Sequence, residues 1–136
     1  MEEEIKKLVS YHQQLTAAAV KTSEIILAAA MSGDLNTITT ETKNRHRLFE
    51  VLNTIQTKIQ ICGQSFEDKK LFREKVMPTL NIWAQDFYNW SEKINQIDQE
   101  IINVLAKQKE QVSQSLAMLF GQKKKIQGYN LSSTKK

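Results

Sequence analysis

A heptad pattern of apolar residues runs through the second half of the chain. Nine successive positions alternate steps of four and three residues: Val76, Leu80, Trp83, Phe87, Trp90, Ile94, Ile97, Ile101 and Val104. This spacing keeps the apolar side chains on one helical face, so it predicts a single long helix over about residues 79–120. Gln108 interrupts the pattern, and Val112 and Leu119 resume it. Such a helix would be roughly 60 Å long, so shorter partner helices cannot cover its whole apolar stripe.

Two shorter helices are predicted ahead of it, over about residues 2–31 and 34–63. Apolar residues recur three and four positions apart in both segments, which is the period of a helix with one buried face. Gly33 suits the left-handed conformation that ends many helices, Asp34 suits the N-cap of the second helix, and Gly63 is expected to stop it. The predicted apolar face of the second helix consists of Leu48, Leu52, Ile55, Ile59 and Cys62.

A third helical element is expected to begin at Ser65. Ser65 and Asp68 have the spacing of a capping box, with Asp in place of the preferred Glu or Gln. Pro78 leaves two alternatives open, because proline kinks a helix from within but is well tolerated in a first turn.

The composition agrees with a wholly helical protein. The chain has only four glycines and one proline, and residues that favour helices are plentiful. The predicted fold is all-α: an elongated antiparallel bundle of three long helices formed by residues 1–121. Residues 122–136 are predicted to form a short, mobile, basic segment, because their Gly, Ser and Lys content disfavours a packed element.

Charge and hydropathy bear on partners and location. The net charge is +4, but part of the excess lies in the C-terminal segment, where a run such as 123–125 more often marks a solvated helix end than a nucleic-acid site. The acidic residues 2–4 are the wrong charge for the start of a signal peptide. The longest apolar run, 25–31, is far shorter than the about 20 residues that span a bilayer. We therefore expect a cytoplasmic protein that binds no nucleic acid and does not insert into a membrane.

The polar residues do not suggest catalysis. His12 and His46 have no His or Cys partner at metal-ligand spacing, and Gly-rich phosphate loops and nucleophile elbows are missing. Asp98 and Glu100 are expected on a solvated helix surface, and Cys62 is expected to face the core. The chain is not expected to be an enzyme or to bind a metal or cofactor.

Trp83, Phe87 and Trp90 concentrate large side chains within two turns of the long helix. They are typical of a bundle core. Large aromatic residues are also typical anchors of a groove that binds an amphipathic helix, and both roles can coexist on one long helix.

Two segments resemble the flagellar type III export chaperones, the small helical family that includes the filament-cap and hook–filament junction chaperones. The segment SGDLNTITTETKNRHRLFEVL resembles the break after helix one and the Arg-marked second helix of that family. The segment INQIDQEIINVLAKQKEQVSQSLAMLFGQKKKIQGYN resembles its closing pattern of a long helix, a lysine-marked break and a late Tyr. The filament-cap branch fits better than the hook–filament junction branch.

The resemblance implies a cytoplasmic chaperone that holds the C-terminal amphipathic helix of an export substrate, a filament-cap or hook-junction protein. It prevents premature assembly and delivers the substrate to the export gate and ATPase complex of the type III secretion machinery. By the same resemblance, Tyr129 is the candidate for contact with the export gate, and Ile126 and Leu131 are candidates for a cover over the cargo groove. The groove candidates are Leu48, Leu52, Trp83, Phe87 and Trp90.

Two other interpretations remain. The first alternative is a coiled-coil adaptor or structural protein that self-associates, as a homodimer, through its long third helix. A further alternative is binding of the basic C-terminal segment to nucleic acid or an anionic membrane, which would depend steeply on salt.

Overall fold

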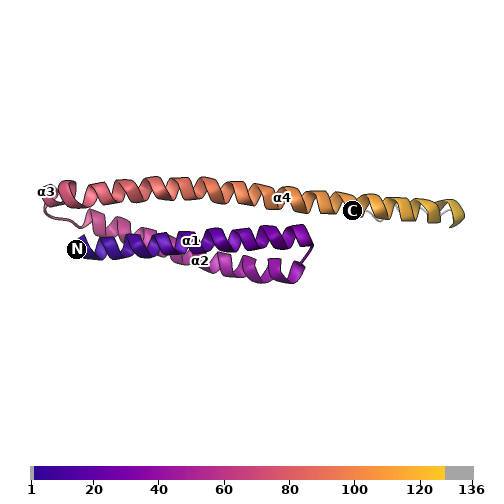
Figure 1. Cartoon of the computed structure of the whole chain (residues 1–136), viewed down its shortest axis with the longest axis horizontal. Helices are drawn as coiled ribbons and strands as arrows, with labels where there is room; N and C mark the ends of the chain where they lie inside the picture. The colour runs from indigo at the N-terminus through magenta and orange to yellow at the C-terminus, as the bar shows by residue number, and fades with distance from the viewer. Residues whose placement is uncertain (1, 128–136) are drawn as a thin grey trace. The chain divides into compact units, whose positions relative to one another are not determined.

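The structure is a computed structural model that describes the backbone of residues 2–127 and the side chains of residues 2–118. Every described element is helical: α1 (Glu2–Ser32), α2 (Leu35–Gln64), the short α3 (Lys69–Leu71), the π-helix η1 (Phe72–Val76) and α4 (Met77–Gln127). Figure 1 shows the three long helices α1, α2 and α4, which confirm the predicted all-α class. The chain divides into two units, Met1–Ile101 and Ile102–Lys136.

The α1–α2 turn forms as its sequence predicts. Gly33 has a φ of 73°, the left-handed conformation that glycine adopts without steric cost. The carboxylate of Asp34 accepts hydrogen bonds from the backbone N–H of Thr37 at 3.1 Å and from its hydroxyl at 2.6 Å. These bonds lower the pKa of Asp34 from its ordinary value. The turn folds α2 back against α1 (Figure 1).

The connection after α2 differs from the predicted capping box. Ser65 closes the end of α2 rather than starting a helix: its N–H donates to Ile61 and Cys62, and its hydroxyl donates to the carbonyl of Ile61 at 2.7 Å. Asp68 is the N-cap of α3, and its carboxylate accepts from the N–H groups of Lys70 and Leu71. The prediction was wrong because a serine serves equally well to satisfy the free carbonyls at a helix end.

The π-helix shows that Pro78 does not begin a helix separated from the preceding element. The chain stays helical from α3 through η1 into α4, although Pro78 is counted within the first turn of α4. The N–H of Met77 bonds to the carbonyl of Phe72, five residues back. A proline ring collides with the carbonyl four residues earlier in a regular α-helix, and a widened π-turn is one way to accommodate that collision.

The core of unit 1 lies between α1, α2 and the first half of α4. Trp83 contacts His12, the indole of Trp90 reaches Thr16, and Asp98 lies at the level of Ser23. Residue numbers along α1 and along α4 rise together through these three contacts, so α1 and α4 run in the same direction. Helix α2 runs opposite to both. The core cluster of buried side chains contains Ile5, Val9, Ile55, Ile59, Phe66, Val76 and Trp83.

Helix α1 is long and apolar enough to cross a membrane by length and composition alone. In unit 1 its apolar face instead packs in the core, where Ile5, Val9 and Ile26 are buried. A core helix of a bundle meets the same criterion of length and composition, so the cytoplasmic location stays a prediction.

The described part of unit 2 is the remainder of α4. The predicted helix end at Gly121 was wrong, because α4 continues to Gln127. Glycine disfavours a helix interior by only about 1 kcal/mol, which the flanking helix formers can offset. Within residues 102–118 several apolar side chains are exposed, namely Ile102, Leu105, Val112, Leu116 and Met118.

Candidate functional site

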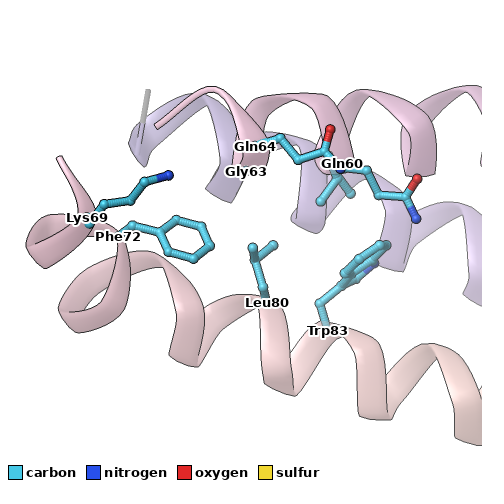
Figure 2. Close-up of a pocket in the computed structure, with 8 residues that line it drawn as sticks. Gln60, Gly63, Gln64, Lys69, Phe72, Leu80 and Trp83 are labelled. Carbon is cyan, nitrogen blue, oxygen red and sulfur yellow. The ribbon is translucent and has the colours of Figure 1, made fainter. Parts of the chain in front are cut away.

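An apolar cavity of about 370 Å³ lies in unit 1, where the end of α2 faces α3, η1 and the start of α4. Figure 2 shows Phe72 and Lys69 at one end of the cavity, Trp83 at the other, and Leu80 between them. The remaining lining residues come from α2: Ile59, Gln60, Gly63 and Gln64. Ile59 and Trp83 belong to the buried core cluster, so the floor of the cavity is apolar and firmly packed.

Two local features keep this cavity open. Gly63 has no side chain, and a Cβ at that position would approach the Cδ1 of Leu80 to 3.4 Å and the ring of Phe72 to 3.8 Å. Phe72 is the first residue of the π-helix, whose i→i+5 hydrogen bonds widen the turn and shift the side chains on either side of it. A cavity with an apolar floor and a few polar groups at its rim is the usual form of a binding site.

Trp83 connects the cavity to a buried contact with α1. Its indole N–H donates to Nδ1 of His12 at 3.1 Å, and the two rings meet edge to face. Phe87, which stacks with Trp83, also meets the imidazole edge to face, with ring centroids 4.7 Å apart. Since Nδ1 accepts a hydrogen bond, the neutral ring carries its proton on Nε2. Nε2 is buried without a hydrogen-bond partner among the described residues.

The burial of His12 predicts a dependence of stability on pH. Removal from solvent lowers the pKa of His12 below its ordinary value near 6.5, because the charged form loses hydration. The unfolded chain therefore binds the proton more readily, and the free energy of unfolding should fall as the pH drops below about 6.5, by at most about 1.4 kcal/mol per pH unit. Urea unfolding at a series of pH values measures this slope.

His12→Gln is the matched control for that titration. The glutamine carbonyl can still accept the indole N–H of Trp83, but the side chain does not titrate. His46 is exposed and pairs with Glu50 in both proteins, so its contribution cancels in the comparison. Identical pH profiles for the two proteins would contradict the assignment to His12.

A second inter-helix cluster lies farther along the bundle. The guanidinium of Arg45 on α2 forms a bidentate ion pair with the carboxylate of Asp98 on α4, with Nη2 at 3.1 Å from Oδ2. Nη1 of Arg45 also donates to the hydroxyl of Ser23 at 3.2 Å, and Ser23 donates to the carbonyl of Ala19. The prediction that Asp98 and Glu100 lie on a solvated helix surface holds for Glu100, which is exposed. It was only partly right for Asp98, whose side chain is 33% exposed and pairs with Arg45.

Aromatic rings continue this cluster. The guanidinium of Arg45 lies over the ring of Phe49, 4.9 Å from its centroid, and Phe49 meets Trp90 edge to face. The indole of Trp90 donates to the carbonyl of Thr16 at 2.9 Å. Three helices are thus joined by one network of charged, polar and aromatic groups.

The structure does not bring all five predicted groove residues to one site. Trp83 alone lines the cavity. Leu52 is buried, Leu48 is half-buried on α2, and the half-buried rings of Phe87 and Trp90 stack with centroids 5.4 Å apart. The assignment of all five residues to a cargo groove stays a prediction. Tyr129 and Leu131 lie outside the described residues, as does the side chain of Ile126.

Sequence reasoning missed the other cavity residues. It interpreted Gly63 only as a helix stop and Leu80 only as a heptad member. The one signal in the sequence was a glycine inside the last turn of a periodic helix, since such a glycine often has a packing reason. The position of Lys69 could not be foreseen, because it depends on the fold of the connection around Asp68.

Neither a metal site nor a known relative points to a function. Among the described residues no group of three His, Cys, Asp or Glu side chains could hold a metal ion. No protein family, curated protein or solved structure matches the chain.

Proposed function

We propose that this protein is a cytoplasmic chaperone of the flagellar type III export system. It binds the C-terminal amphipathic helix of an export substrate, a filament-cap or hook-junction protein, and prevents its premature assembly. It then delivers the substrate to the export gate and ATPase complex, with Tyr129 as the candidate gate contact. The resemblance of residues 32–52 and 94–130 to this family motivates the proposal.

The observation that carries the proposal is the apolar cavity at the end of α2. Its floor is made of packed core residues, Ile59 and Trp83. The other residues that line it come from α2, α3, η1 and the start of α4. An amphipathic helix binds such a site by inserting its apolar side chains, which hides them from water and from other subunits. A chaperone for a self-assembling substrate needs this activity and no chemical step.

Filling the cavity should weaken cargo binding. Gly63→Leu places an apolar side chain where a cargo anchor would insert, and we expect it to weaken binding by at least about tenfold. Gly63→Ala is the matched control, because its Cβ makes only ordinary contacts with Leu80 and Phe72. The measurement is calorimetric titration with C-terminal helical fragments of the same organism's flagellar cap and hook-junction proteins.

The same titration tests the role of the C-terminal segment. A version that ends at Gln122 should bind the fragments more tightly than the full chain if Ile126 and Leu131 cover the groove. If neither form of the wild-type protein binds either fragment, the chaperone proposal is wrong.

A second candidate function is a coiled-coil adaptor that self-associates through α4. The observation that favours it is the exposure of apolar side chains in unit 2, where Val112 is 59% and Leu116 is 42% exposed. Sedimentation equilibrium distinguishes the two functions. Association in the absence of cargo, combined with a lack of fragment binding, would favour the adaptor.

A further inference from the structure

We infer that the cavity at the end of α2 recognises an acidic helix: a partner helix that inserts an apolar anchor and places a carboxylate one turn away against Lys69. This inference rests on the proposed helix-binding function and names the chemistry of the partner. It follows from the position of the cavity's single charged residue relative to its apolar floor.

The lining of the cavity combines apolar and polar side chains. Phe72, Leu80 and Trp83 form the apolar part that Figure 2 shows between the helices. Gln60 and Gln64 lie on α2 one turn apart, at the polar side of the cavity. A volume of about 370 Å³ is near the small end of ligand sites, which suits one or two apolar side chains of a docked helix better than a long stretch of it.

Lys69 supplies a cation at the rim that no carboxylate of the described residues neutralises. Its ammonium group donates to the backbone carbonyl of Phe66 at 3.4 Å, and it forms no ion pair with another described residue. The nearest acidic side chain in sequence, Asp68, is engaged with the N–H groups of Lys70 and Leu71 as an N-cap. Lys69 can therefore pair with a carboxylate on a partner.

The geometry of a bound helix connects the apolar floor of the cavity with Lys69 at its rim. Side chains three or four residues apart lie on one face of a helix. A glutamate one turn from an inserted leucine therefore projects toward the rim of the cavity rather than its floor. Because docking excludes water from around Lys69, the ion pair forms in a lower dielectric than it would on an open surface. The site should consequently prefer acidic amphipathic helices to basic ones.

The test uses the full chain and two capped, Ala-rich helical peptides. One carries a leucine followed one turn later by a glutamate, and the other has glutamine in place of that glutamate. Binding to the wild-type chain is followed by the fluorescence anisotropy of a dye on the N-terminus of each peptide. We expect the glutamate peptide to bind about threefold to tenfold more tightly than the glutamine peptide. Lys69→Gln should remove this preference.

Controls separate this inference from the proposed function. Lys70→Gln removes a neighbouring charge that does not line the cavity and should leave the preference intact. Lys69→Glu should reverse it, so that a lysine peptide binds more tightly than the glutamate peptide. If the glutamate and glutamine peptides bind the wild type equally, the inference is wrong while a helix-binding function stands. If the cargo fragments also fail to bind, the proposed function fails as well.

Discussion

Replacing Trp83 with alanine should lower the free energy of unfolding by about 4 kcal/mol. The side chain is only 8% exposed and belongs to the core cluster with Ile59 and Val76. Its removal leaves a void next to an existing cavity and takes away the donor that satisfies Nδ1 of His12. Loss of apolar contact and loss of a buried hydrogen-bond partner act in the same direction. Urea unfolding followed by circular dichroism measures the effect.

Trp83→Phe separates the two causes of this loss of stability, and Tyr88→Ala is the control for an exposed aromatic residue. Trp83→Phe keeps most of the ring volume but removes the indole N–H, so it should cost much less, about 1–2 kcal/mol. Tyr88→Ala truncates an aromatic side chain of the same helix that is 61% exposed, and its effect should stay within about 0.5 kcal/mol. A Trp83→Ala protein as stable as the Tyr88→Ala protein would show that Trp83 does not hold the core together.

The double role of Trp83 limits what its truncation can reveal about binding. A residue that both supports the core and lines the cavity loses stability and affinity together when it is truncated, so the two effects would be confounded. Gly63 and Lys69 avoid this problem. Gly63 lies at the edge of the cavity with room for a Cβ, and Lys69 is exposed.

Helical elements could be predicted from the sequence far better than the contacts between them. Apolar periodicity is a local property, so it located α1, α2 and α4 to within a few residues at most ends. The helix ends that were predicted wrongly are those where one residue type suits two structural roles. Ser65 is able to close one helix as well as begin another, and Gly121 was overridden by the good helix formers around it.

Contacts between helices depend on register, which periodicity does not determine. His12 was considered from the sequence only as a metal ligand, and the alignment of α1 with α4 is what sets it against the rings of Trp83 and Phe87. Asp98 was indistinguishable from other helical carboxylates until α2 brought Arg45 against it. The cavity itself arises where a glycine, a π-turn and a connection meet, and none of these is periodic.

The Arg45–Asp98 ion pair should contribute strongly to the alignment of α2 with α4. Asp98→Ala is expected to lower the free energy of unfolding by about 2–3 kcal/mol, because it leaves the guanidinium of Arg45 partly buried without its partner. The side chain of Arg45 is 19% exposed, so water can restore only part of its hydration. Chemical unfolding at low and high salt checks this value, and the loss should persist at high salt because screening is weak for partly buried pairs.

A double-mutant cycle measures the interaction energy of the Arg45–Asp98 pair apart from the effect of each residue alone. Arg45→Met with Asp98→Leu replaces the ion pair with apolar side chains, and the double variant should be less destabilised than the sum of the single variants. Glu50→Gln is the control for a solvated pair, since His46 and Glu50 are both mostly exposed, and it should change stability by less than about 0.5 kcal/mol. Additive effects in the cycle would contradict a direct coupling. A non-additive result would mean that Arg45 of α2 and Asp98 of α4 interact directly, and that their ion pair stabilises the alignment of the two helices.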